Sequence, residues 1–243
     1  KGKKYDGNKF GNSALRNGAL LSITNKKKHS PKIIFRKDPL KFFHKISSIF
    51  RKSSDTNIIS ITGSSGKTSV KELTGFCLNK FGKTYFSKKS FNNKYGVPLS
   101  IFNTPEQSKF TVLEVGMNKK GEINSLTKLI RPDIGLITNI SYAHIQNFKN
   151  LNQIAEAKGE IINNITPNGT MIINMDDKYY KYFLKKTTQN GLKSITFSTK
   201  KTRADVSFLS QKKNKNNYLL KIRIKGITKT FKVSKELSNY KEN

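Results

Sequence analysis

The sequence is poor in the residues from which several common kinds of site are built. It has one cysteine, Cys77, no tryptophan, six prolines and only 15 acidic residues among 243. A single cysteine excludes an internal disulfide and a Cys/His zinc finger, and it fits the reducing cytoplasm, where we expect the protein to be located. No apolar run approaches the roughly 20 residues of a membrane helix, so we predict no membrane span.

Positive charge, in contrast, is abundant. The chain has 47 Lys and Arg residues and a formal net charge of +32, an excess that is typical of proteins binding nucleic acid or membrane surfaces. The lysines are spread along the whole chain, however, and occur with many Asn and Ile residues, as in KKNKNNYLLKIRIK at 212–225. This mixture indicates a genome-wide preference for A/T-rich codons. We therefore expect no specific nucleic-acid partner.

The pattern of apolar residues predicts two parts. Residues 1–52 contain predicted strands at 21–25 and 31–36 and a helix at 39–50, and polar residues lead into the second part, 53–243. Strands and helices alternate there, which predicts an α/β fold with a mostly parallel sheet, and residues 204–233 predict an attached antiparallel meander. The predicted elements are the strands 57–62, 111–115, 134–140, 170–174 and 194–198 and the helices 68–80, 122–130, 151–165 and 177–186.

A Gly-Lys-Thr sequence follows the first strand of the second part. Gly63 to Thr68 form G-x-x-G-K-T, two residues shorter than the common phosphate loop G-x-x-x-x-G-K-[ST]. A strand that passes through a small-residue turn into a helix points backbone N–H groups at an anion. Lys67 would then neutralise phosphate charge, and the hydroxyl of Thr68 would complete a magnesium shell. The alternative is a Gly/Ser turn with a lone lysine.

Two further candidates lie near the ends of later strands, where ligands bind in sheets of this kind. Glu114 interrupts an apolar strand, and a buried carboxylate is costly unless it is paired or bound to a cation. A magnesium ion between Thr68, Glu114 and a phosphate is one interpretation, and an edge glutamate that reaches solvent is the other. His144 follows the next strand, either as a metal-binding or catalytic residue or as a surface histidine.

The stretch SFNNKYGVPLS, residues 90–100, forms a predicted polar turn before a helix whose first turn contains Pro98. The amides of Asn92 and Asn93 either bind a phosphate or sugar or close the turn on its own backbone. Lys158 lies on a helix with polar and apolar faces, and the pattern alone predicts a solvated lysine.

Together these stretches resemble the Mur ligase family, ATP-dependent amide-bond-forming ligases (EC 6.3.2 type) of peptidoglycan synthesis, and hence of cell-wall biogenesis, cell shape and cell division. In that family the short phosphate loop is the normal form. Met117 and Thr138 depart from the residues usual there, but neither change removes a charge. The matching stretches are KGKKYDGNKF, TGSSGKTSVKE, SFNNKYGVPLS, EVGMNKKGEI, RPDIGLITNISYAHIQNF, AEAKGEI and NMDD.

The resemblance implies a phosphate-loop ATPase central domain at 53–243, preceded at 1–52 by part of a small α/β nucleotide-sugar-binding domain. The motifs NN-x-x-GVP and E-x-G-x-N-x-x-GEI match the members that join D-alanyl-D-alanine to UDP-N-acetylmuramoyl-tripeptide through an acyl phosphate, using ATP and Mg²⁺. We expect a monomer, and an internal fragment that lacks the C-terminal ligand-binding domain and is inactive alone. The alternatives are another Mur ligase or a folylpolyglutamate-synthase-type ligase, and a non-catalytic nucleotide-binding module.

The resemblance also implies roles for individual residues. Lys67 would contact the β and γ phosphates, Thr68 and Glu114 would hold one magnesium ion, and His144 would help to hold a second cation. Lys158 matches a position at which Mur ligases carry a carbamylated lysine, which would make it an anionic metal ligand. The expected catalytic residues are thus Lys67, His144 and Lys158. The expected nucleotide-binding residues are Gly63, Ser64, Ser65, Gly66, Lys67, Thr68, Ser69, Asn92, Asn93 and Asn139.

Overall fold

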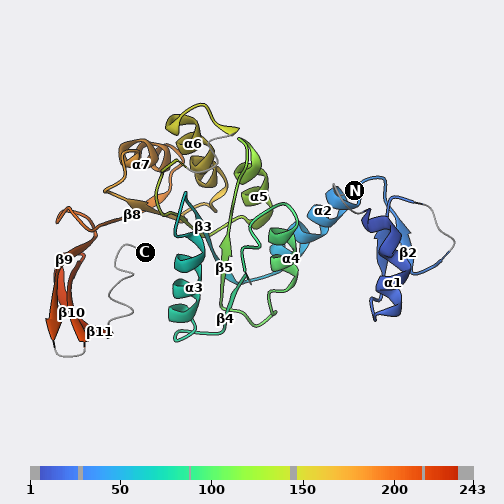
Figure 1. The fold of residues 1–243 in the computed structure, drawn as a ribbon, viewed down its shortest axis with the longest axis horizontal. Coiled ribbons are helices and arrows are strands. Elements are labelled where there is room, and N and C mark those ends of the chain that lie inside the picture. The colour runs from blue at the N-terminus through green and yellow to red at the C-terminus, as the bar shows by residue number, and fades with distance from the viewer. Residues whose placement is uncertain (1–5, 27–29, 88, 143–146, 215–216, 235–243) are drawn as a thin grey trace. The chain divides into compact units, whose positions relative to one another are not determined.

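The computed structural model describes residues 6–26, 30–87, 89–142, 147–214 and 217–234, and the chain forms two compact units, residues 1–50 and 51–243. The first unit has a two-stranded parallel sheet, whose strands lie within the two predicted strand segments. A short 3-10 helix and α1 precede this sheet, and α2 follows it (Figure 1). The elements are η1 (Gly7–Phe10), α1 (Gly11–Arg16), β1 (Ser22–Thr24), β2 (Ile33–Phe35) and α2 (Pro39–Lys52).

The second unit is built on a nine-stranded sheet with the order β11-β10-β9-β8-β7-β6-β3-β5-β4. The pairs from β4 to β9 are parallel, and β9, β10 and β11 form an antiparallel meander. The predicted parallel sheet with an attached meander is therefore confirmed. Its strands are β3 (Asn57–Thr62), β4 (Thr84–Phe86), β5 (Phe110–Glu114), β6 (Ile134–Ile137), β7 (Thr170–Asn174), β8 (Lys193–Ser198), β9 (Val206–Asn214), β10 (Asn217–Ile224) and β11 (Ile227–Ser234).

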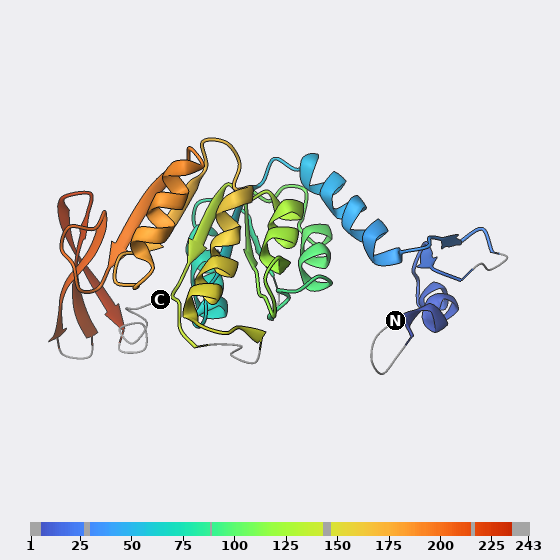
Figure 2. The same cartoon turned by 90° about the horizontal axis from the view of Figure 1, so that it is seen from above.

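Helices cover both faces of the parallel strands, which explains why β3 carries apolar side chains on both of its faces. Ile59 and Ile61 belong to a core cluster with Val70 of α3, whereas Ile58 belongs to a larger cluster with residues of α4, α5, α6 and α7. Figures 1 and 2 show these helices packed along the strands. The helices of this unit are α3 (Lys67–Leu78), α4 (Gly96–Phe102), α5 (Glu122–Ile130), α6 (Leu151–Lys158) and α7 (Tyr180–Gln189), with the 3-10 helix η3 (Gly159–Asn164).

Several predicted boundaries were wrong. The strand predicted at 134–140 ends at Ile137, because Thr138 and the residues after it turn toward the loop that follows β3. The helix predicted at 151–165 is α6 followed by η3, and the change occurs at Gly159, where a Cβ would lie 3.2 Å from the ring of Phe183. The edge strand β4 was not predicted, because its three residues are too few to show a period.

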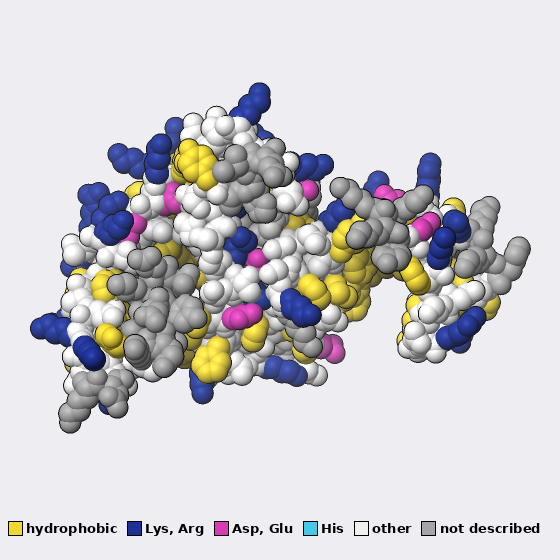
Figure 3. All heavy atoms as spheres, viewed as in Figure 1, with side chains coloured by type: hydrophobic (Ala, Val, Ile, Leu, Met, Phe, Trp, Pro, Cys, Tyr) yellow, Lys and Arg dark blue, Asp and Glu magenta, His cyan; other side chains and the backbone are white. Residues whose placement is uncertain are grey.

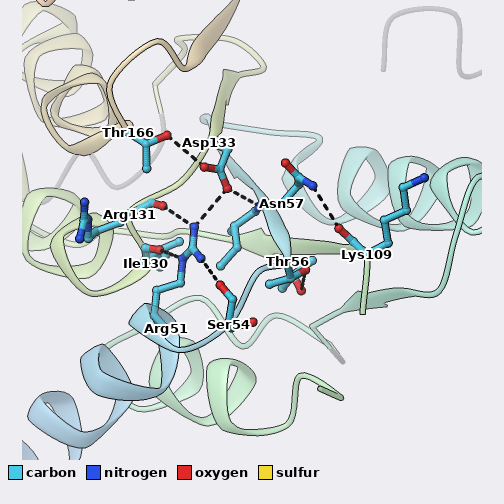
Figure 4. A network of polar contacts seen from close by, with 11 residues as sticks. Arg51, Ser54, Thr56, Asn57, Lys109, Ile130, Arg131, Asp133 and Thr166 are labelled. Carbon is cyan, nitrogen blue, oxygen red and sulfur yellow. Dashed lines mark hydrogen bonds and ion pairs between the residues drawn. The ribbon is translucent and has the colours of Figure 1, made fainter. Parts of the chain in front are cut away.

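A partly buried ionic network joins the start of the second unit to later segments of the same unit (Figure 4). The guanidinium of Arg51 lies 3.1 Å from Oδ2 of Asp133. The same carboxylate accepts the backbone N–H of Ile58 at 2.8 Å and the hydroxyl of Thr166 at 3.0 Å, so it joins the entries of β3 and β6 to the turn before β7. Arg51 also donates to the carbonyl oxygens of Ser54, Ile130 and Arg131.

The surface carries the excess of positive charge in a scattered form. On the face seen in Figure 3, Lys and Arg side chains are distributed over the surface and acidic side chains are few. Among the described residues, no helix is both long enough and apolar enough to cross a bilayer.

Candidate active site

The loop between β3 and α3 has the backbone that the sequence predicted for a phosphate loop. Gly63 has a φ of +153°, and Gly66, the residue before α3, has a φ of +77°. Residues with a Cβ rarely adopt these backbone conformations. A Cβ at Gly63 would lie 1.8 Å from Oγ1 of Thr138, so the backbone also approaches its neighbour too closely for any other residue. The loop opens α3, whose first N–H groups have no acceptor within the helix.

The loop after β6 holds this turn in place. Thr138 donates its hydroxyl to the carbonyl of Ser65 at 2.6 Å. Oδ1 of Asn139 accepts the backbone N–H and the hydroxyl of Ser65 at 3.2 and 3.1 Å, and its backbone carbonyl accepts the N–H of Ser64 at 2.9 Å. Ser64 also exchanges two hydrogen bonds with the backbone of Ser141, each 2.9 Å long. Asn139 therefore acts here as a support for the loop.

Two lysines meet at one carbonyl oxygen of this loop. Lys67 donates to the carbonyl of Gly63 at 2.9 Å and to that of Ser64 at 3.3 Å, and Lys158, at the end of α6, donates to Gly63 at 2.8 Å. Burial and then the charge of Lys67 lower the pKa of Lys158 from 10.5 to about 7. Burial also lowers the pKa of Lys67, and the carboxylate of Glu114 opposes that shift. Lys158 is only 2% exposed, so the prediction of a solvated lysine from pattern alone was wrong.

Glu114 is buried at the end of β5, with 1% of its surface exposed, so it is not an edge residue that reaches solvent. Oε2 accepts the hydroxyl of Thr68 at 2.8 Å, and Oε1 accepts the amide of Asn92 at 2.7 Å. The hydroxyl of Ser90 lies 3.4 Å from that of Thr68. Both direct donors to this carboxylate are neutral, so its charge has no cation bonded to it among the described residues.

The two neighbouring asparagines do different things. Asn92 points to Glu114, whereas Oδ1 of Asn93 accepts the backbone N–H groups of Tyr95 and Gly96, both at 3.0 Å. Asn93 thus closes the turn before α4. Ser69 lies in the first turn of α3 and is partly exposed.

His144 lies outside the described residues. Among those that are described, no group of three or more His, Cys, Asp or Glu side chains could hold a metal ion.

The sheet order explains why these residues meet. β7, β6, β3 and β5 are adjacent in the sheet, so Glu114 at the end of β5, the phosphate loop after β3 and Thr138 after β6 lie at the carboxyl ends of neighbouring strands. Sequence reasoning missed the residues that brace this edge from β7. Asn174 donates to the carbonyl of Thr138 at 3.1 Å, and Asp177 accepts the N–H of Ile140 at 2.7 Å. The NMDD stretch, residues 174–177, which begins at the last residue of β7, was the available signal.

This geometry, with a strand, a glycine turn and a helix start carrying a lysine and a hydroxyl, defines a phosphate-loop nucleotide-binding domain. The model of the Mur ligase middle domain matches residues 61–237, so the chain belongs to the Mur ligase family.

Curated proteins similar to the chain include several UDP-N-acetylmuramoyl-tripeptide–D-alanyl-D-alanine ligases, among them one from Buchnera aphidicola and one from Escherichia coli. It is 36% identical over 211 residues to that of Buchnera aphidicola subsp. Acyrthosiphon pisum, covering 86% of this chain and 46% of the relative. It is 34% identical over 179 residues to that of Escherichia coli, covering 73% of this chain and 39% of the relative. The chain therefore spans less than half the length of these relatives.

Solved structures share the fold. The MurF ligase of Thermotoga maritima in complex with ADP has a TM-score of 0.83 at 26% identity, over 96% of this chain and 53% of that one. MurF from Acinetobacter baumannii has a TM-score of 0.86 at 23% identity, over 98% of this chain and 52% of that one.

Proposed function

We propose that this chain supplies the ATP-binding part of a ligase that joins D-alanyl-D-alanine to UDP-N-acetylmuramoyl-tripeptide. The observation that carries the proposal is the convergence of Lys67, Lys158 and the Thr68–Glu114 pair around one short phosphate loop. The names of the two curated relatives support this choice of substrates, and the ADP complex of the Thermotoga structure supports the choice of nucleotide.

In this proposal the turn from Gly63 to Ser69 surrounds the nucleotide phosphates. The first N–H groups of α3 face the anion, and Lys67 exchanges its bonds to the carbonyls of Gly63 and Ser64 for bonds to the terminal phosphate oxygens. Asn139 and Thr138 keep the loop in shape from the neighbouring strand.

The residues present fit a magnesium ion. Mg²⁺ prefers oxygen ligands and is commonly held by one or two carboxylates together with substrate phosphates. Thr68 and Glu114 offer two such oxygens 2.8 Å apart, and burial of the carboxylate without a bonded cation is the condition that a divalent ion relieves. A bound ion would neutralise charge that develops on the transferring phosphoryl group. We assign His144 to a second cation from its place after β6.

The reaction then consists of two transfers. A carboxylate oxygen of the tripeptide attacks the γ-phosphorus of ATP, and ADP leaves. The amine of D-alanyl-D-alanine next attacks the resulting acyl carbon, so that a C–N bond forms, phosphate leaves and the amine loses a proton. Lys67 stabilises charge on the phosphoryl oxygens, because such transfers depend mainly on positioning and electrostatics.

Lys158 is suited to carbamylation. A lysine with a pKa near 7 is neutral in about half of the molecules at neutral pH, and only a neutral amine adds to carbon dioxide. In that step the Lys158 nitrogen bonds to the carbon of carbon dioxide and releases a proton, which leaves an anionic carbamate. This group would be a metal ligand.

We further propose that residues 1–52 are part of a nucleotide-sugar-binding domain, that residues 53–243 are part of the ATPase domain, and that the acceptor dipeptide binds elsewhere in a longer polypeptide. The relatives are about twice as long as the chain, which supports this division.

The proposal is tested with the complete reading frame that contains these residues. Phosphate release is followed with ATP, magnesium and UDP-N-acetylmuramoyl-tripeptide, with and without D-alanyl-D-alanine. We expect release that requires the dipeptide, that is lost in Lys67→Ala and that persists in Lys128→Ala, which changes an exposed lysine of α5. Release with a different amine acceptor would keep the ligase class and overturn the substrates. No release with any acceptor would favour a binding module.

A further inference from the structure

A second lysine of α3, Lys71, is completely buried, and none of the roles proposed above uses it. It lies one turn after Lys67, with 0% of its surface exposed. Its ammonium donates to the backbone carbonyls of Ser87 at 2.6 Å and Lys89 at 2.7 Å, and the carboxylate of Glu72 is 3.7 Å away. Lysine is almost never fully buried unless it is paired, because removing its charge from water is costly. The two carbonyls and the carboxylate offset this cost, and the carbonyls tie Lys71 to the segment that follows β4.

The two carbonyls belong to the segment that follows β4 and enters the candidate active site. One residue beyond Lys89, Ser90 places its hydroxyl 3.4 Å from that of Thr68. Two residues further, the amide of Asn92 donates to Glu114 at 2.7 Å. The backbone N–H of Asn92 also donates to the carbonyl of Ser90 at 2.8 Å. The residues that contact the site, Ser90 and Asn92, therefore come directly after Lys89, to which Lys71 donates.

The backbone of this segment is held in an unfavourable shape. Lys89 has a φ of +50°, a left-handed conformation that costs a residue with a side chain free energy and persists only where the surroundings enforce it. The ammonium of Lys71, on α3, bonds to the carbonyl of this residue. At the far end, the carbonyl of Asn92 accepts the N–H of Gly116, just after β5, at 2.8 Å. The segment is thus held by Lys71 at Ser87 and Lys89 and by the backbone of Gly116 at Asn92.

We propose that Lys71 is a positioning residue, which holds Ser90 and Asn92 against the Thr68–Glu114 pair. The same helix presents Lys67 and Thr68 to the phosphate loop and Lys71 to the segment after β4, so one rigid element sets the distance between the two halves of the site. The identity of the ligand bound at this site rests on the function proposed above. The positioning of Ser90 and Asn92 by Lys71 does not depend on that function.

The test compares Lys71→Met with Lys128→Met in the complete reading frame. Both changes remove a helical lysine charge, but Lys128 is exposed on α5. Backbone hydrogen exchange is measured for residues 89–96 and, as a reference, for β3. An unpaired buried carbonyl is expected to accelerate local opening about tenfold or more, so exchange at 89–96 rises in Lys71→Met while β3 keeps its rate. Lys128→Met should change neither.

A second readout is the magnesium dependence of ADP binding, measured directly and without turnover. We expect the magnesium concentration for half-maximal binding to rise about tenfold in Lys71→Met, with ADP affinity in the absence of magnesium unchanged. Unchanged exchange at 89–96, equal acceleration in β3, or faster local exchange with unchanged magnesium dependence would each overturn the proposal. If the unmutated protein fails to bind ADP with magnesium, the proposed function fails, and exchange at 89–96 alone then decides the positioning role.

Discussion

Replacing Gly63 with alanine tests the geometry of the phosphate loop most directly. The new Cβ would lie 1.8 Å from Oγ1 of Thr138, 3.0 Å from its Cβ and 3.1 Å from its backbone nitrogen. Thr138 could relieve the closest of these contacts by rotating its side chain, but it would then lose its 2.6 Å bond to the carbonyl of Ser65. The backbone must in addition keep a φ of +153°, which is nearly exclusive to glycine.

The magnitude follows from these separate costs. Gly191 provides the matched control, because its φ is +65° and a Cβ there would meet no atom within 4 Å. Gly191→Ala should cost only the left-handed backbone, about 1–2 kcal/mol. Gly63→Ala adds the lost hydrogen bond and the crowding against Thr138, for a total of about 3–5 kcal/mol. In a domain of this size the melting temperature should fall by about 5 °C in the control and by about 10–15 °C in Gly63→Ala.

The assay is thermal unfolding followed by circular dichroism, since the chain has no tryptophan to report by fluorescence. Each glycine change is also made in a Thr138→Ala background, which removes the oxygen that causes the 1.8 Å contact. We expect the effect of Gly63→Ala to shrink there by about 1 kcal/mol or more, and that of Gly191→Ala to stay the same. Equal shifts for the two glycine variants, or full additivity with Thr138→Ala, would refute the reasoning.

Three further predictions concern charged groups. Glu114→Gln keeps the size of the side chain and removes its charge, so magnesium-dependent ADP binding should weaken about tenfold or more in a titration. ADP binding without metal should persist. An equal loss of binding with and without metal would argue against a metal role for Glu114. For Lys158, whose pKa is lowered to about 7, the unfolded chain binds more protons between pH 7 and 10.5. The cost in stability of burying the charged Lys158 is therefore full below pH 7, and it fades as the pH rises toward 10.5. Lys158→Met should flatten the resulting rise of the free energy of unfolding between pH 7 and 10.5, as measured by urea unfolding at several pH values. An unchanged slope would contradict the lowered pKa. Asp133→Asn should lower the melting temperature by about 5 °C, because the charge paired with Arg51 is lost, and a change at the exposed Asp55 should have almost no effect; similar shifts in both would refute a specific role of the network.

Much of the fold of the second unit was predictable because the spacing of its apolar residues and the positions of its turn residues indicate the same elements. Ile58, Ile59 and Ile61 showed a buried strand, and the glycines on either side of Ser64 and Ser65 showed where it turns. What could not be predicted depends on tertiary contacts. The end of β6 at Ile137 is decided by Thr138 bonding to another loop, and the sequence of residues 134–140 alone carries no trace of that bond.

The same division holds for the site. The sequence placed Thr68 just after one strand and its loop and Glu114 at the end of another strand. Both positions lie at the carboxyl ends of strands in a parallel sheet, and the structure brings the two side chains together. Whether a lysine on an amphipathic helix is buried or solvated depends on what covers it, so Lys71 and Lys158 could not be separated from the many surface lysines by pattern. Adjacent identical residues pose a similar problem, since Asn92 and Asn93 differ only in the direction that the turn gives them.

The bonds of Lys67 to the carbonyls of Gly63 and Ser64 have a consequence for affinity. A flexible lysine in water must lose both rotamer freedom and hydration when it captures an anion, and these losses subtract from the binding free energy. Lys67 is already partly desolvated and is held over the loop by two neutral acceptors. When a phosphate binds, the ammonium of Lys67 exchanges its two carbonyl acceptors for charged phosphate oxygens with little movement of the side chain. The loop is therefore preorganised, and most of the attraction between the ammonium and the phosphate remains available as affinity.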